Sequence, residues 1–248
     1  MMNWKQLISA KRFGMEEFHE ERQENRSEFQ RDYDRLIFSA PFRRLQNKTQ
    51  VFPLPGSVFV HNRLTHSLEV ASVGRSLGDD VAKALLERHP ELQDSFLPEI
   101  GSIVSAACLA HDLGNPPFGH SGEKAISTFF SEGKGVRLKE KQPNGEQLSP
   151  MEWEDLTHFE GNANAFRILT HQFEGRRKGG FVLTYTTLAS IVKYPFSSSL
   201  ARTKSKFGFF VSEEESFQKI ATELGLTLLN EHPLKYARHP LVYLVEAA

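Results

Sequence analysis

Apolar residues recur every three or four positions along most of this chain, which is the spacing of amphipathic helices. The run SIVSAACLA, residues 102–110, has no polar side and therefore predicts a helix that is buried all round. Gly114 suits the end of that helix, and the two prolines at 116 and 117 cannot continue it. We therefore expect His111 and Asp112 on the last turn of a buried helix.

Further helices are predicted on both sides of this central one. The longest runs from Leu64 to Leu86, and its apolar positions mark roughly one face: Leu64, Leu68, Ala71, Leu77, Val81 and Leu85. Others are expected over residues 121–130, 158–173 and 187–193, and from Pro240 onwards. Capping-box patterns place helix starts at Ser27, Ser149 and Ser212.

The predicted fold class is all-α, with one or two small hairpins within residues 181–185 and 197–211. We expect residues 1–26 to form a short N-terminal helix and a polar tail. Residues 27–248 are then one helical domain, because 248 residues suffice for one sizeable core.

Composition narrows the functional classes. The net charge is -1, whereas a dedicated nucleic-acid binder would usually be strongly basic. Cys108 is the one cysteine, so no internal disulfide framework is possible. No apolar run approaches the roughly 20 residues of a membrane helix, and the N-terminus lacks a signal-peptide core. These features predict a cytoplasmic enzyme with no membrane partner.

The candidate chemistry lies at the end of the central helix. A buried, unpaired Asp112 would be costly, so it needs a cation or strong donors. Together with His111 and His66 it forms a ligand set that suits Mn²⁺, Fe²⁺, Co²⁺, Ni²⁺ or Zn²⁺, and the carboxylate also suits Mg²⁺. The alternative is a structural histidine–carboxylate pair in the core.

A second pair of polar residues follows one turn later. His120 and Glu123 are three positions apart, so on a helix they share a face. Such a pair suits general acid–base catalysis, with the carboxylate fixing the tautomer of the imidazole. The alternative is a capping arrangement on a surface helix.

Several motifs together resemble the HD-superfamily deoxynucleoside triphosphate triphosphohydrolases of the bacterial dGTPase type. These are FRRLQNKTQVF, NRLTHS, AHDLGNPPFGHSGE and FEGNA, and the similarity extends from about Arg31 to Ala248. The resemblance implies an all-α HD domain over residues 27–248 and one divalent metal ion, such as magnesium or manganese. The implied reaction hydrolyses a dNTP, dGTP above all, to deoxynucleoside and inorganic triphosphate, with water attacking the α-phosphorus.

The resemblance also implies roles for individual residues. The metal ligands are His66, His111 and Asp112, and the catalytic pair is His120 and Glu123. The implied substrate contacts are Gln50, Arg63, His158, Asn162, Lys193 and Tyr194. An amide such as that of Gln50 can bond the deoxyribose, and a guanidinium fork suits phosphate oxygens. Ordinary loop and surface roles for these side chains are the alternatives.

The sequence departs from the family's pattern at its end. In similar proteins an aspartate that completes the metal site follows a stretch like YLVEAA, but this sequence stops at Ala248. We therefore expect a domain that is incomplete at the C-terminus and whose turnover is weak or absent. The final helix, which ends without a cap, agrees with this expectation.

Other functions and partners stay open. One alternative is a phosphohydrolase of the same chemistry whose substrate is a nucleoside monophosphate or a phosphodiester. The other alternative is a nucleotide- or DNA-binding regulator without turnover. The acid–base pair favours the enzyme. A homo-oligomer is expected, and single-stranded DNA is an effector of some relatives. Two basic patches, residues 43–48 and 202–206, are interpreted as solvated faces.

Overall fold

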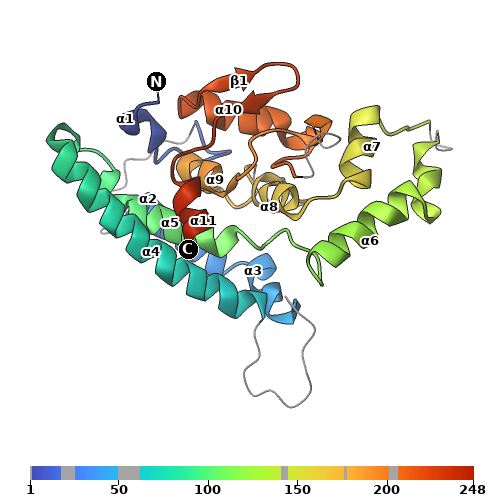
Figure 1. Cartoon of the computed structure of the whole chain (residues 1–248), viewed down its shortest axis with the longest axis horizontal. Coiled ribbons are helices and arrows are strands. Elements are labelled where there is room, and N and C mark those ends of the chain that lie inside the picture. Colours follow the sequence, from blue (N-terminus) through green and yellow to red (C-terminus); the bar gives the residue numbers. More distant parts are fainter. Residues whose placement is uncertain (1, 18–25, 50–61, 141–144, 176–177, 201–205) are drawn as a thin grey trace, which may run out of the picture.

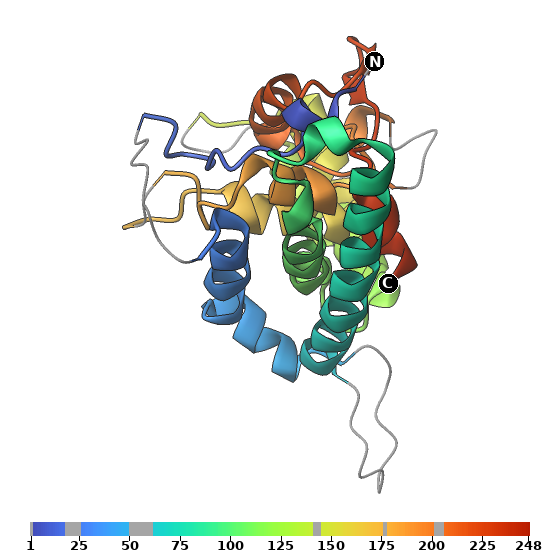
Figure 2. The same ribbon diagram turned by 90° about the vertical axis from the view of Figure 1, so that its left-hand side faces the viewer.

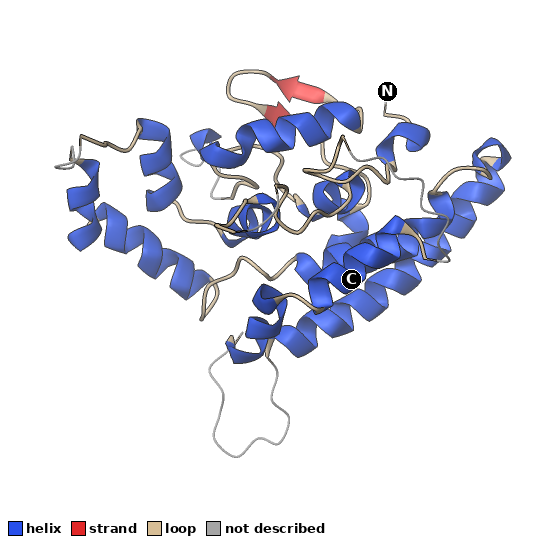
Figure 3. Ribbon diagram, turned by 180° about the vertical axis from the view of Figure 1, so that it is seen from behind, coloured by secondary structure: helices blue, strands red, loops and turns tan. Residues whose placement is uncertain are grey.

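The structure is a computed structural model that describes residues 2–17, 26–49, 62–140, 145–175, 178–200 and 206–248 (Figure 1). Helices dominate it, and the described residues form a single two-stranded sheet, so the predicted all-α class is confirmed (Figure 3). The α-helices are α1 Trp4–Leu7, α2 Glu28–Ile37, α3 Ala40–Arg44, α4 Arg63–Arg88, α5 Ile100–Ala110, α6 His120–Ser131, α7 Pro150–Thr157, α8 Gly161–Thr170, α9 Tyr185–Ile191, α10 Glu214–Glu223 and α11 Val242–Ala247. Short 3-10 helices are η1 Leu45–Asn47, η2 Pro90–Leu92, η3 Leu97–Glu99, η4 Lys134–Lys139, η5 Ser198–Leu200 and η6 Val211–Glu213. No helix in the described part of the chain is long and apolar enough to cross a membrane.

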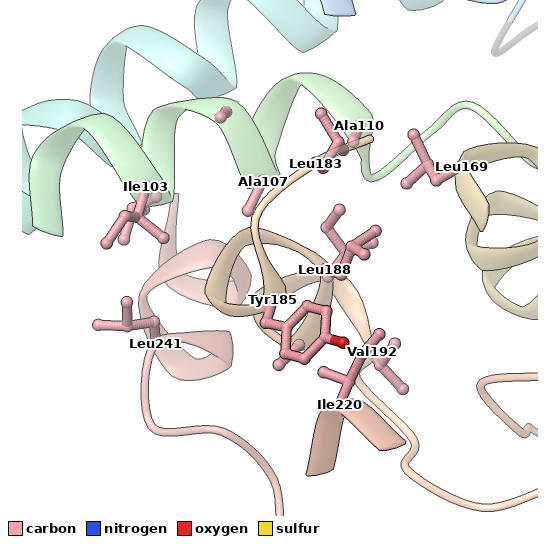
Figure 4. Packing of buried hydrophobic residues seen from close by; sticks show 14 of the residues in the cluster. Ile103, Ala107, Ala110, Leu169, Leu183, Tyr185, Leu188, Val192, Ile220 and Leu241 are labelled. Carbon is pink, nitrogen blue, oxygen red and sulfur yellow. The ribbon is translucent and has the colours of Figure 1, made fainter. Parts of the chain in front are cut away.

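The central helix is α5, and every one of its residues is buried, as its apolar sequence predicts. It lies between α2 and α4 and packs also against α9 and α11 (Figure 2). Figure 4 shows this core: Ile103 and Ala107 of α5 face Leu188 of α9 and Leu241. Because its sides are covered, α5 holds its C-terminal end, and the residues that follow, in a fixed position.

The buried face of α4 overlaps only in part with the predicted one: Ala71 is buried, and Leu64 and Leu85 are partly buried against the core. Its buried residues are small or polar: Arg63, Ser67, Ala71, Gly74, Gly78 and Ala82. Leu68, predicted to face the core, is 41% exposed. A Cβ at Gly78 would lie 2.7 Å from the Cα of Gly101, so the two helices approach closely because large side chains are absent between them. Close packing, rather than the leucine stripe, therefore selected the buried face.

The single sheet is a hairpin outside the predicted segments. Strand β1, Leu228–Asn230, pairs antiparallel with β2, Lys235–Tyr236. Residues 181–185 instead lead into α9, and only the isolated bridge of Thr184 with Arg12 is formed there. In the second segment Ser197 and Phe209 form one bridge. The hairpin predicted at residues 181–185 is wrong, because this segment is buried as an irregular lead into α9, whereas residues 201–205 of the second segment lie outside the described residues.

Two of the three predicted helix caps are formed. The Ser27 hydroxyl accepts a hydrogen bond from the amide of Gln30, and Ser149 forms a complete capping box with Glu152. The Ser212 cap is wrong, since α10 begins two residues later and has no side-chain cap. The Ser212 hydroxyl instead contacts Arg167 and Glu213. Arg167 belongs to α8, so a pattern of neighbouring residues in the sequence does not predict this contact.

The N-terminal segment is held in the same core as the central helix. Leu7 and Ile8 are buried, and the Arg12 guanidinium pairs with Asp32 at 2.7 Å and with Glu28. The ring of His239 lies between Leu7 and the start of α11: its Nε2 is 3.0 Å from the Leu7 carbonyl, and its Nδ1 accepts from the Leu241 amide. Both ring nitrogens are thus satisfied in the neutral form.

Protonation of His239 is expected to destabilise the fold in mild acid. Burial lowers the pKa of His239 from its ordinary value near 6.5 to about 4. Below about pH 6.5 the unfolded chain therefore binds a proton that the folded chain refuses, so this stability is present above that pH and is lost as the pH falls toward 4. The loss approaches about 3 kcal/mol.

The measurement is urea unfolding at pH 7.5 and 4.5 for the unaltered protein and for His239→Gln. Glutamine offers one donor and one acceptor but does not titrate in this range. We expect the unaltered protein to lose about 2–3 kcal/mol more than the variant. Equal losses would assign the acid sensitivity to groups other than His239; Asp155 is not one of them, because burial raises its pKa to about 6 and its protonation stabilises the folded state.

Candidate active site

Three side chains that can bind a metal ion converge at the end of α5. His66, on the first turn of α4, and His111 and Asp112, directly after α5, each offer a ligand atom, and these atoms lie within 4.8 Å of one another. The imidazole rings of His66 and His111 are 5.3 Å apart between centroids. Residues 45 positions apart in sequence meet because α4 packs along α5.

The neighbours of His111 and Asp112 fix how they point. His111 Nδ1 is 2.6 Å from the carbonyl oxygen of Cys108, so Nδ1 carries the proton and Nε2 keeps its lone pair. That Nε2 is 3.4 Å from Asp112 Oδ1. Asn115 donates its side-chain amide to the same carboxylate. The lone pair of His111 and one oxygen of Asp112 therefore face the same space.

The protonation states also suit a cation. Burial would raise the pKa of Asp112, but the charges of His111 and Arg63 outweigh it and hold the pKa below its usual value. Burial lowers the pKa of His66, and the neighbouring His111 lowers it further. The lowered pKa values favour a carboxylate at Asp112 and a neutral imidazole at His66, and these are the forms that bind divalent metals.

Arg63 joins this group of ligands to the turn after α5. Its Nη1 donates to Asp112 Oδ2 at 2.7 Å, and its Nε is buried without a hydrogen-bond partner among the described residues. A Cβ at Gly119 would lie 3.1 Å from Arg63 Nη2, so the guanidinium also lies against the backbone just before His120. The motif resemblance predicts that Arg63 contacts a substrate phosphate. In the structure its one ion pair among the described residues is with Asp112.

His120 and Glu123 meet at the start of α6, as their spacing predicts. His120 Nδ1 is 2.9 Å from Glu123 Oε2, and the histidine side chain is 86% exposed while the glutamate is buried. The other oxygen, Oε1, accepts from the Gly161 amide at the start of α8. Burial would raise the pKa of Glu123, but the bonds to His120 and Gly161 hold it below its usual value. The ring of His120 is thus oriented by a carboxylate and open to a ligand at Nε2.

These observations can be set beside known proteins. The family described as HD domain matches residues 63–179. This range contains the three candidate metal ligands, Arg63 and the pair His120 and Glu123. The chain carries an HD domain.

Relatives match the whole chain. It is 46% identical to a deoxyguanosinetriphosphate triphosphohydrolase-like protein of Synechocystis sp., covering 100% of the chain and 57% of that protein. A Pseudomonas aeruginosa protein with the same description is also 46% identical, with 54% of its length covered. A deoxyguanosinetriphosphate triphosphohydrolase of Yersinia enterocolitica is 36% identical, with 52% covered. The resemblance found in the motifs is confirmed, and the chain spans about half the length of the curated relatives it matches.

A cluster that sequence reasoning did not find supports Glu123 in the HD domain. Lys206 Nζ lies 3.5 Å from Glu123 Oε2 and 3.1 Å from Glu160 Oε2. Asn162 donates its side-chain amide to Glu160. Burial would lower the pKa of Lys206, but the two carboxylates outweigh it and raise the pKa. The FEGN motif could have pointed to Glu160, which it contains. Nothing in the sequence indicates that Glu160 contacts Lys206.

The basic patches are only partly the solvated faces that composition suggested. Lys206 is held by carboxylates, and Lys48 donates to the carbonyl of Asn115, bracing the turn after Asp112. Arg43 and Arg44 are exposed, as predicted. Arg202 and Lys204 lie outside the described residues.

The remaining predicted substrate contacts are placed less centrally. Asn162 belongs to the Lys206 cluster. His158 is exposed, and its ring contacts Glu154. Lys193 pairs with Glu246 at 2.6 Å and lies over the ring of Tyr194. Gln50 lies outside the described residues.

Gly161 is a position where a side chain does not fit. A Cβ there would lie 2.1 Å from Asn115 Oδ1 and 2.8 Å from Glu123 Oε1. Gly161→Ala should therefore push aside the partners of both Asp112 and His120. We expect at least about a 10-fold loss of catalytic rate, because misplacement by 1 Å can cost 100-fold.

Alanine also favours helix, which works against a general loss of stability. Rate and thermal unfolding of Gly161→Ala are measured together. A fall in rate with the unfolding temperature kept within a few degrees supports the local effect. An unchanged rate would show that the asparagine and glutamate contacts do not matter.

Proposed function

We propose that this HD domain hydrolyses a deoxynucleoside triphosphate, dGTP above all, to deoxynucleoside and inorganic triphosphate. One observation carries the proposal: the ligand group His66, His111 and Asp112 is joined through Arg63 to the acid–base pair. A metal-binding group beside an oriented histidine is what water attack at a phosphorus requires.

The ligand group would hold one divalent ion. When bound, such an ion polarises a phosphoryl oxygen and makes water more acidic. Asp112 supplies the negative charge, while His111, fixed by the Cys108 carbonyl, supplies a directed lone pair. Arg63 keeps the Asp112 carboxylate in place, and its Nε is buried without a hydrogen-bond partner among the described residues. A guanidinium there favours the negative charge of a phosphate.

The proton transfer is assigned to His120. Its Nδ1 faces Glu123, so Nε2 is the atom that exchanges a proton with the leaving group or with water. Glu123 is itself fixed by the Gly161 amide and by Lys206. A binding module would not require an oriented and exposed imidazole, which favours the enzyme over a regulator.

The substrate class is supported by the relatives, whose descriptions name deoxyguanosine triphosphate. Gln50 as a deoxyribose contact, and Lys193 and Tyr194 as phosphate contacts, complete the proposed site. Manganese or magnesium is the proposed ion.

Product analysis tests the proposal. The protein is incubated in excess over dGTP with Mn²⁺, so that a slow single turnover is visible, and products are separated by anion exchange. Deoxyguanosine with intact triphosphate supports water attack at the α-phosphorus. Pyrophosphate or orthophosphate as the first product contradicts it, and cleavage of dGMP or a phosphodiester alone favours the other phosphohydrolase. Binding of dGTP without any product favours a regulator.

A further inference from the structure

A second feature includes Lys206, the lysine that contacts Glu123 of the acid–base pair. It is a pocket of about 710 Å³ lined by residues of five stretches of the chain, among them Tyr194, Lys206, Lys235, Arg238 and Tyr243. Its volume falls within the range typical of small-molecule sites. Lys206 is thus shared: it lines the pocket and also contacts Glu123, the partner of His120.

Arg238 is built into this pocket as a rigid cation. Its guanidinium lies 5.5 Å from the ring centre of Tyr194 and 5.7 Å from that of Tyr243. Its Nη1 donates to Glu246 at 2.9 Å, and its other nitrogens have no hydrogen bond among the described residues. Stacked and anchored on one side, the planar fork loses little freedom when it binds an anion on the other.

The local charge is positive although the chain as a whole carries -1. Glu246 is shared by two cations, since Lys193 also contacts it at 2.6 Å. Lys235, on strand β2, forms no ion pair within the described ranges. An excess of cations over carboxylates around a concave surface attracts anions. Cation–π contacts with the tyrosines hold the cations in position.

We propose that this pocket is a phosphate-binding site in which Arg238 and Lys235 are the ligands. The ligand class is a chain of phosphates, as in a nucleoside triphosphate, because two separated cations match several charged groups better than one. The inference deepens the proposed function and rests on it only for the origin of that ligand. The phosphates belong either to the substrate, reaching past Lys206, or to a second phosphate compound.

The test uses inorganic tripolyphosphate as the probe, measured by calorimetry on the chain without added metal. Arg238→Gln and Lys235→Gln should each weaken binding about 10-fold or more, as expected for a lost charge-assisted hydrogen bond. Arg238→Lys should recover part of the loss, since it keeps the charge without the fork. Lys83→Gln, on the exposed side of α4, removes one charge elsewhere and should leave binding nearly unchanged.

No binding of tripolyphosphate, or equal losses in the Lys83 variant, would overturn the site. If Arg238→Gln unfolds, Lys235→Gln, at a half-buried position of strand β2, still decides. A non-hydrolysable deoxynucleoside triphosphate separates the two origins: one-for-one displacement of tripolyphosphate assigns the site to the substrate, and simultaneous binding assigns it to a second ligand. The proposed reaction is tested by a different measurement, the analysis of the products formed from dGTP, so its failure is distinguished from failure of this phosphate site.

Discussion

His111→Ala is expected to weaken binding of Mn²⁺ by at least about 100-fold, because even the loss of a partner outside the ligand set can cost that much. The variant removes the Nε2 lone pair that the Cys108 carbonyl orients. It leaves His66 and Asp112 in place, but two ligands hold an ion far less firmly than three. Calorimetric titration with Mn²⁺ gives the affinity directly and does not depend on turnover.

The control for this experiment is His89→Ala. That histidine is exposed at the end of α4 and pairs only with Glu91 among the described residues. Its removal should leave the affinity for Mn²⁺ unchanged. If His111→Ala also bound Mn²⁺ as tightly as the unaltered protein, the three residues would be a structural cluster in the core, and the proposed metal site would be wrong.

His120→Ala is expected to lower the rate of dGTP hydrolysis by about 100- to 10,000-fold, the usual contribution of general acid–base catalysis. The side chain is 86% exposed, so its loss leaves no cavity. It also lies outside the ligand group, so Mn²⁺ affinity should stay the same. Rate and affinity are therefore measured on the same preparation.

Ser121→Ala provides the matched control, because this exposed residue is next to His120 on the first turn of α6. It should change neither quantity. A parallel fall of rate and metal affinity in His120→Ala would make His120 a ligand or a structural residue. An unchanged rate would remove it from the reaction altogether.

The sequence by itself determined the parts of this protein that depend on local chemistry. The run 102–110, which has no polar side, became the buried helix α5, and the Gly-Asn-Pro-Pro turn ended it next to His111 and Asp112. The three-residue spacing of His120 and Glu123 produced a hydrogen bond on one helix. Caps at Ser27 and Ser149 formed because their partners lie within the same turn.

Tertiary structure decided what depends on contacts between distant segments. The buried face of α4 follows from glycines that let it approach α5, which a hydrophobic pattern does not reveal. Lys206 looked like part of a solvated patch, but two buried carboxylates from α6 and the start of α8 hold it. Arg63 likewise meets Asp112 only because α4 and α5 pack together. Sequence named the reacting groups because their chemistry is local; packing decided which charges surround them.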